Sequence, residues 1–313
     1  MKEKLQDLAK NLQGEFYSDA LLKALYATDA SVYRELPLAV ALPKTTEDLQ
    51  QLINFASKHN TSLIPRAAGT SLAGQCVGDG IVVDISKYFT KINQLNKKEK
   101  TVTLQPGVIR DDLNRFIEPY SLFFSPNTST SNRCMIGGMT GNNSSGTTSI
   151  KYGVTRDKII AMKCLLSDGS EVIFEAITPE EFQQKCKQQN LEGKIYRELY
   201  ELLKPKEVQQ EIHRQFPKGD IHRRNTGYAI DELITTEVFS EATRKLNICK
   251  LLAGSEGTLA FTTELTLQLD DLPPKHSALV AAHFKSIEDC LTAVEPVMTH
   301  SLFTCEMMDK TIL

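Results

Sequence analysis

Several common features are missing from this 313-residue sequence. It contains no run of about 18 apolar residues, so nothing in it predicts a membrane span. The N-terminus is charged and lacks the apolar core of a signal peptide. No stretch concentrates Lys and Arg, and a net charge of -3 with a pI near 6.1 gives no field suited to a phosphate backbone. We therefore expect a cytoplasmic protein that binds no nucleic acid.

Cysteine pairs and clusters of metal ligands are missing too. The seven cysteines are widely spaced and never form a C-x-x-C pair, which favours reduced thiols over disulfides or a metal cluster. An apolar run predicts a strand over residues 276–284, in which His276 and His283 stand seven apart. An odd separation puts two side chains on opposite faces of a strand, so these histidines could not share a metal without a β-bulge between them. The sequence predicts no metal site.

The residues that are present suit a folded core. With 41% hydrophobic and 24% charged residues, the chain can form one large domain or two ordinary ones. Apolar residues at helical intervals predict a helical packing arm over residues 1–33. A short apolar run, a helix opened by Thr45 or Thr46, a strand at 62–65 and another apolar run at 80–85 follow. This order predicts a β-α-β unit.

A loop of small residues, 66–75, follows the second of these predicted strands. Open sheets bind ligands at the carboxyl ends of their strands. The loop is not a P-loop, because Gln75 and Cys76 stand where that motif has its Lys and its hydroxyl. A dinucleotide-binding turn is also disfavoured, because Val83 stands at its third glycine. The backbone amides of such a loop could receive a pyrophosphate, and an ordinary tight turn is the alternative.

A second unusual segment runs from Ser125 to Asp157 and holds five of the 17 glycines. It has few side chains with which to build a core, so we expect its backbone to wrap a flat polar ligand. Its hydroxyl and amide side chains could bond such a ligand, while Pro126 and Ile136 could cover a ring face. A flexible linker is the alternative, although apolar anchors interrupt the segment.

Three motifs, in order along the chain, carry a resemblance to a known family. They are PRAAGTSLAGQ at 65–75, IGGM at 136–139 with NNSSG and YG at 142–146 and 152–153, and GSEGTL at 254–259. Over roughly residues 34–268 the chain resembles the FAD-binding domain of the family typified by p-cresol methylhydroxylase and vanillyl-alcohol oxidase. It is similar in particular to the branch of glycolate-oxidase-subunit-like, D-lactate and D-2-hydroxyglutarate dehydrogenases.

The resemblance implies an α+β fold with two lobes and FAD between them. A small parallel α/β lobe would span about 34–93, and a larger lobe with an antiparallel sheet about 94–268. The larger lobe would carry an insertion at about 178–250 with two helical stretches. Residues 269–313 would begin an α/β cap domain, whose remainder we expect in a missing C-terminal half or in a partner chain.

The resemblance also implies the residues that hold FAD. The loop would take the pyrophosphate, the second segment would line the ribityl chain and the isoalloxazine, and a third segment would close on the adenosine side. These residues are Arg66, Ala67, Ala68, Gly69, Thr70, Ser71, Pro126, Ile136, Gly137, Gly138, Thr140, Asn142, Asn143, Gly146, Gly153, Glu256 and Gly257.

Two departures from the family pattern are informative. Members that bind FAD covalently often carry a histidine just after the loop glycine, where this sequence has Thr70, so we expect non-covalent FAD. The insertion contains Arg223, Arg224 and Tyr228, in a segment similar to one in large dehydrogenases fused to iron-sulfur modules. Substrate contact and a solvated charged insertion are both open for the weak catalytic candidates Arg223 and Arg224. For Tyr228, the third weak candidate, the alternative is that it anchors the insertion.

The implied activity is oxidation of a small 2-hydroxy acid by hydride transfer to flavin N5, with electrons passing on to an unidentified acceptor. None of the six histidines stands in a cofactor motif, so we expect the catalytic base outside this chain and the chain alone to be inactive. Two alternatives stay open. One is an enzyme like UDP-N-acetylenolpyruvoylglucosamine reductase, and the other is a non-catalytic flavin-carrying subunit that needs a partner chain.

Overall fold

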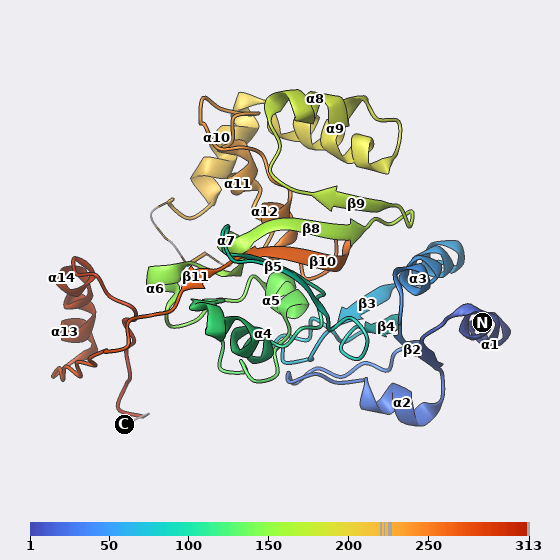
Figure 1. Ribbon diagram of the computed structural model, residues 1–313, viewed down its shortest axis with the longest axis horizontal. Helices are drawn as coiled ribbons and strands as arrows, with labels where there is room; N and C mark the ends of the chain where they lie inside the picture. The colour runs from blue at the N-terminus through green and yellow to red at the C-terminus, as the bar shows by residue number, and fades with distance from the viewer. Residues whose placement is uncertain (220, 222, 225–226, 312–313) are drawn as a thin grey trace.

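The computed structural model describes residues 1–219, 221, 223–224 and 227–311 (Figure 1). A small sheet has the strand order β1-β2-β4-β3. Its strands are β1 (Glu15–Tyr17), β2 (Ala39–Leu42), β3 (Leu63–Arg66) and β4 (Ile81–Asp84). Strands β2, β4 and β3 are parallel, and all four residues of β2 and of β4 are buried. The predicted β-α-β unit is confirmed.

Helix α3 (Thr46–His59) connects β2 to β3. A capping box starts it, because the Thr45 hydroxyl accepts from the backbone N of Asp48 while the Asp48 carboxylate bonds back to the cap. Asn60, in the left-handed conformation, ends it. Leu49 and Leu52 point into the core of the small lobe and are fully buried. The helix therefore packs on the sheet as its apolar spacing predicts.

The N-terminal arm is only partly helical. Helix α1 (Lys2–Asn11) buries Leu5 and Leu8, and α2 (Ala20–Leu25) buries none of its residues. Between them lies β1, which pairs antiparallel with the edge of β2. The expectation of a continuous helical arm is therefore wrong at β1, since a three-residue strand depends on a distant partner and carries no local period.

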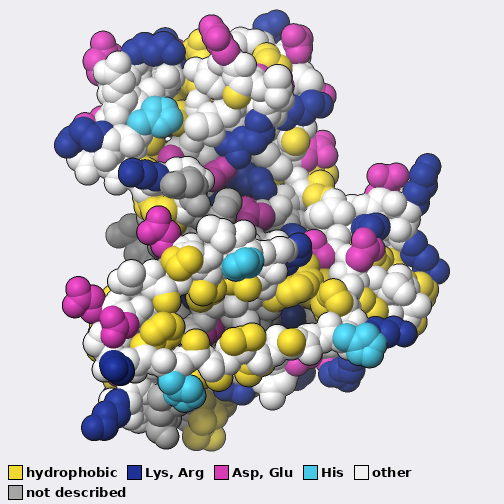
Figure 2. Space-filling view, turned by 90° about the vertical axis from the view of Figure 1, so that its left-hand side faces the viewer, with side chains coloured by type: hydrophobic (Ala, Val, Ile, Leu, Met, Phe, Trp, Pro, Cys, Tyr) yellow, Lys and Arg dark blue, Asp and Glu magenta, His cyan; other side chains and the backbone are white. Residues whose placement is uncertain are grey.

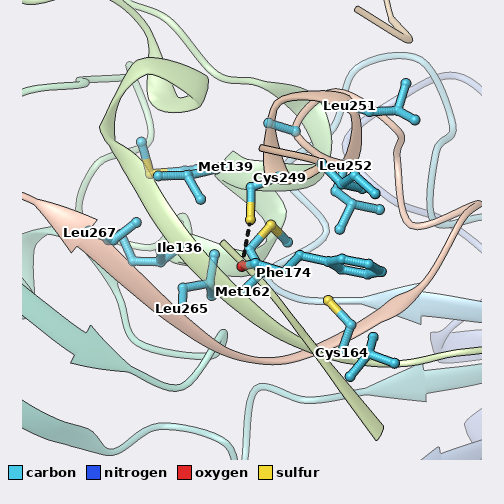
Figure 3. Packing of buried hydrophobic residues seen from close by; sticks show 14 of the residues in the cluster. Ile136, Met139, Met162, Cys164, Phe174, Cys249, Leu251, Leu252, Leu265 and Leu267 are labelled. Carbon is cyan, nitrogen blue, oxygen red and sulfur yellow. Dashed lines mark hydrogen bonds between the residues drawn. The ribbon is translucent and has the colours of Figure 1, made fainter. Parts of the chain in front are cut away.

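The larger lobe is built on an antiparallel sheet in the order β5-β6-β10-β8-β9. Its strands are β5 (Ile92–Asn96), β6 (Thr101–Leu104), β8 (Ile159–Leu165), β9 (Glu171–Phe174) and β10 (Phe261–Gln268). Along β10 buried and half-buried residues alternate, so one face of the strand lies on the core. Figure 3 shows that core, where Leu265 and Leu267 of β10 lie near Ile136 and Met162. The predicted antiparallel lobe is confirmed.

More helices than the two expected fill the insertion. They are α8 (Pro179–Lys187), α9 (Leu191–Leu203), α10 (Lys206–Gln215) and α11 (Ile230–Ile234), followed by α12 (Cys249–Leu252). In Figure 1, α8 and α9 lie above β9 at the top of the molecule. Phe182 of α8 and Tyr196 of α9 are almost fully buried in the same core as the sheet. The insertion is thus part of the hydrophobic core of this lobe.

The strand predicted over residues 276–284 is wrong. These residues form no strand, and Leu279 and Val280 are 88% and 87% exposed. A lone apolar run cannot become a strand without a partner edge, and none of the described strands pairs with it. The opposite-face argument for His276 and His283 therefore no longer applies.

The predicted helix after Ser286 is confirmed, because that side chain caps α13 (Ile287–Thr292). A second short helix, α14 (Val294–Met298), follows it. Neither helix buries a residue, and Figure 2 shows many apolar side chains on the face of the molecule that carries them. All seven cysteines are free, as predicted. No helix among the described residues is long and apolar enough to cross a membrane.

Candidate functional site

A cavity of about 410 Å³ lies where three distant segments of the chain meet. They are the loop after β3, helix α5 (Ile136–Asn142) with the residues before it, and the segment that leads into β10. The cavity brings together most of the predicted cofactor residues, namely Arg66, Ala67, Ala68, Gly69, Thr70, Ser71, Gly137, Gly138, Thr140, Asn142, Glu256 and Gly257.

The loop after β3 needs glycine at two positions. Gly69 and Gly74 have φ values of +64° and +76°, in the left-handed region that other residues avoid. A Cβ on Gly69 would lie 2.7 Å from Nη2 of Arg66, and one on Gly74 would lie 2.8 Å from the ring of Tyr33. The loop therefore follows this path only because both positions lack a side chain.

Helix α5 approaches the loop through its own glycines. A Cβ on Gly137 would lie 2.5 Å from Cβ of Pro106, and one on Gly138 would lie 3.4 Å from Cβ of Ala67. The hydroxyl oxygen of Thr140 is buried on the cavity wall and has no hydrogen-bond partner among the described residues. A buried polar atom without a partner costs about 1 to 3 kcal/mol, so a polar ligand would stabilise this wall.

Glu256 and Gly257 close the cavity opposite α5. Both have positive φ values, and the backbone N of Glu256 donates to the carbonyl of Gly141 at 2.9 Å. Asn142 Nδ2 donates to the Glu256 carboxylate at 3.2 Å. Burial raises the pKa of Glu256, while the hydrogen bond from Asn142 acts in the opposite direction. This carboxylate and Arg66 are the charged side chains among the described residues that line the cavity.

Five predicted cofactor residues do not line this cavity: Pro126, Ile136, Asn143, Gly146 and Gly153. Ile136 is fully buried in the core of the larger lobe. Gly146 lies against the backbone of Asn127, where a Cβ would meet the carbonyl oxygen at 2.0 Å. Gly153 has a φ of +76° and lines a second cavity of about 320 Å³. Their roles in binding FAD stay predictions.

Asn143 holds the end of α5 in place. It is fully buried in the left-handed conformation, and its Oδ1 accepts from the backbone N of Arg156 at 2.8 Å. The Arg156 guanidinium in turn donates to the carbonyl oxygens of Ala253 at 2.7 Å and Gly227 at 3.0 Å. A buried arginine thus ties α5 to the segment that carries Glu256. Arg156 lies in the segment from Ser125 to Asp157, but the sequence of that segment did not reveal this role.

The three weak catalytic candidates also lie off the 410 Å³ cavity. Arg223 donates to the Ser145 hydroxyl at 3.0 Å, and the Tyr228 hydroxyl bonds to that of Thr258. Arg224 forms ion pairs with carboxylates of α11, including Glu232 at 2.5 Å, and lines the second cavity. The contacts of Arg223 and Tyr228 hold the insertion against the rest of the lobe, whereas the ion pairs of Arg224 lie within the insertion. Substrate contact stays a prediction for all three residues.

Several cavity residues carried no sequence signal. Three of them line the cavity wall: Met162 of β8, Phe261 of β10 and Pro106 of the turn after β6. They are ordinary strand and turn residues, and only strand pairing brings them together. Thr128 and Cys134 also line the cavity, and their side chains lie 3.2 Å apart. The polar composition of their segment was the only clue to them.

Comparisons with known proteins agree with this geometry. A family model described as an FAD binding domain matches residues 37–175. A D-2-hydroxyglutarate dehydrogenase from Haemophilus influenzae is 32% identical over 99% of this chain, which spans 30% of that protein. A glycolate oxidase subunit from Bacillus subtilis is 35% identical over 93% of this chain, which spans 50% of it. The chain therefore spans between about a third and a half of these relatives.

Among solved structures, an alkyldihydroxyacetonephosphate synthase shares the fold. Its TM-score is 0.59 at 16% identity, over 87% of this chain and 41% of that one. The cavity fits the cofactor that the family model names, because glycine-rich backbone forms its walls and the Thr140 hydroxyl lacks a partner there. Residues 37–175 therefore carry an FAD binding domain, and FAD is its cofactor.

Proposed function

We propose that this chain holds FAD in an enzyme that oxidises a D-2-hydroxy acid. The observation that carries the proposal is the 410 Å³ cavity, which unites the three glycine-containing motifs. The relatives named D-2-hydroxyglutarate dehydrogenase support the substrate class, because they align with nearly the whole chain. FAD, when bound, supplies the hydride acceptor for this oxidation.

The loop after β3 would hold the pyrophosphate. Its positive φ values turn the backbone so that amides of residues 67–71 can face an anion, and Arg66 adds a cation beside Gly69. Thr140 and Asn142 would bond the polar middle of the cofactor, and Glu256 would lie on the adenosine side. Phe261 and Met162 offer the apolar cover that a flat ring needs.

Attachment of FAD would be non-covalent. Thr70 follows the loop glycine, and two thiols line the cavity. Burial raises the pKa of Cys76 to about 11 and also raises that of Cys134. Thiolates, not thiols, are the nucleophiles, so both cysteines are poor candidates for a flavin linkage at neutral pH. Acid precipitation should release the flavin into the supernatant, and a yellow pellet would refute this part of the proposal.

The substrate class is tested by flavin reduction without oxygen. The whole product of the gene, loaded with FAD, is mixed with D-2-hydroxyglutarate, D-lactate or glycolate, with dithionite as the positive control. We expect one of these acids to bleach the visible absorbance of the flavin, and the L-enantiomer of a chiral substrate to fail. If dithionite alone bleaches it, the proposed substrate class is wrong. The cytoplasmic location stays a prediction.

A further inference from the structure

Arg66 brings a positive charge to the cavity and forms no ion pair with a described carboxylate. It lines the cavity at the end of β3, and its Nη2 would meet a Cβ on Gly69 at 2.7 Å. None of the ion pairs among the described residues includes it. A guanidinium beside a loop of small residues is well suited to a phosphate oxygen, which it can bind through a charge-assisted hydrogen bond.

The N-terminal arm holds this guanidinium from the other side. Nη1 of Arg66 donates to the backbone oxygen of Thr28 at 2.8 Å. The Arg66 guanidinium carbon lies 5.2 Å from the centroid of the Tyr26 ring, within the range of a cation-π contact. The Tyr26 hydroxyl donates to Asp84 at 2.6 Å, and Asp84 stands opposite Arg66 in the register of β4 and β3. Arm and sheet thus both fix the side chain.

The same arm segment also contacts the loop itself. The backbone N of Ala30 donates to the carbonyl of Gly69 at 3.1 Å. The Cys76 thiol donates to the Asp29 carboxylate at 3.6 Å, and the Tyr33 ring lies directly against Gly74. Each of these contacts joins residues far apart in the sequence. Residues 26–33 therefore cover the loop along its length, although no sequence motif marked them.

We propose that the segment 26–33, through Tyr26, positions Arg66 to bind the phosphate groups of FAD. This rests on the placement of the pyrophosphate proposed above. Tyr26 is then a positioning residue, because it touches Arg66 and does not line the cavity. Its ring orients the cation, and the hydroxyl bond to Asp84 fixes the ring.

The first measurement compares FAD with riboflavin, which has no phosphate. In the Arg66→Met variant the Kd for FAD should rise about tenfold to a hundredfold, which is the usual range for a hydrogen bond to a charged group. The Kd for riboflavin should change less than twofold. Binding of FAD should also depend less on KCl concentration in the variant, because one charge pair is gone. A loss that is equal for both ligands would contradict a role for Arg66 at the phosphates.

The second measurement is a double-mutant cycle between positions 26 and 66. Tyr26→Leu alone should raise the Kd for FAD about threefold to tenfold and leave the Kd for riboflavin unchanged. In the Arg66→Met background the same change should have no further effect, since Tyr26 acts through Arg66. Tyr26→Phe keeps the ring and should lie between wild type and Tyr26→Leu. If Tyr26→Leu does not fold, Tyr26→Met takes its place, because methionine fills the space of the tyrosine without providing a ring.

A matched control removes another cation-π contact. Lys97 lies 3.9 Å from the centroid of the Tyr120 ring, and neither residue lines the cavity. Tyr120→Leu should leave the Kd for FAD unchanged. If Arg66→Met leaves FAD binding unchanged, the pyrophosphate placement itself is wrong. Two results would overturn the positioning role of Tyr26. In the first, Arg66→Met weakens FAD binding and Tyr26→Leu does not. In the second, Tyr26→Leu weakens FAD binding equally in wild type and in the Arg66→Met background.

Discussion

Gly69 shows how a single residue controls the cofactor loop. Its φ of +64° disfavours any side chain, and Arg66 already occupies the space of a Cβ. Gly69→Asp would add backbone strain of about 1 to 3 kcal/mol and bring a carboxylate to the proposed pyrophosphate position. We expect the Kd for FAD, measured by fluorescence titration, to rise at least about a hundredfold.

Two variants control for this substitution. Gly219→Asp introduces the same side chain at a position where a Cβ would meet nothing within 4 Å, so FAD affinity should stay as in wild type. Thr70→Ala leaves Gly69 and its backbone conformation unchanged, so it should raise the Kd for FAD only a few-fold. Unchanged FAD affinity in Gly69→Asp would refute the pyrophosphate assignment.

Among the elements, α3 depends on one buried carboxylate. Asp48 is fully buried and accepts from the backbone N of Gln13 at 2.8 Å, Gly14 at 2.9 Å and Lys44 at 2.8 Å. Asp48→Ala leaves these donors without an acceptor, so we expect a loss of about 3 to 5 kcal/mol in the free energy of unfolding. Thr45→Ala removes only the cap and should cost about 1 kcal/mol. Urea denaturation compares the two, and equal losses would show that Asp48 acts only as a cap.

The insertion helices offer a second test, with neighbouring leucines as a matched pair. In α9, Leu203 is fully buried in the core and Leu202 is 58% exposed. Leu203→Ala should lower the free energy of unfolding by about 2 to 5 kcal/mol, because it leaves a cavity. Leu202→Ala should change it by less than about 0.5 kcal/mol. A small effect of both, measured in urea, would mean that the insertion folds apart from the sheet.

For the molecule as a whole, we expect that this chain binds FAD but does not turn over a hydroxy acid by itself. Arg66 and Glu256 are the charged residues among the described cavity lining, and Arg66 is assigned to the phosphates. A hydroxy acid would then find no second cation among the described residues of the cavity to orient its carboxylate. Positioning can account for about 7 to 11 kcal/mol of a barrier. This chain alone, loaded with FAD, should therefore not be reduced by D-lactate, glycolate or D-2-hydroxyglutarate within minutes without oxygen, while dithionite reduces it at once.

The opposite result would be informative. Rapid bleaching by one of the acids would show that residues 1–313 already hold the groups for turnover. Arg223, Arg224 and Tyr228 would then be the first residues to replace, since they are the cationic and hydroxyl groups of the insertion that the sequence singled out.

The sequence by itself determined the features that depend on local chemistry. Left-handed turns need glycine, so Gly69 marked the loop after β3 from its sequence alone. The cap at Thr45 and the apolar period of α3 likewise act within a few residues. The position of the ligand loop at the carboxyl end of β3 could be predicted too, because the loop directly follows the apolar run of that strand in the sequence. These local signals were sufficient to predict the β-α-β unit and the ligand loop after it, whereas the two lobes and the cofactor residues were implied by the resemblance to a known family.

Only the tertiary structure decided what depends on partners distant in the sequence. Strand β10 enters between β6 and β8, and this pairing brings Phe261 and Met162 to the cavity. Strand β1 exists because the edge of β2 accepts it, whereas the apolar run at 276–284 pairs with no described strand and stays irregular. The contact of Tyr26 with Arg66 also joins remote segments. Hydrogen bonds and burial across such distances depend on the folded chain, so no local pattern encodes them.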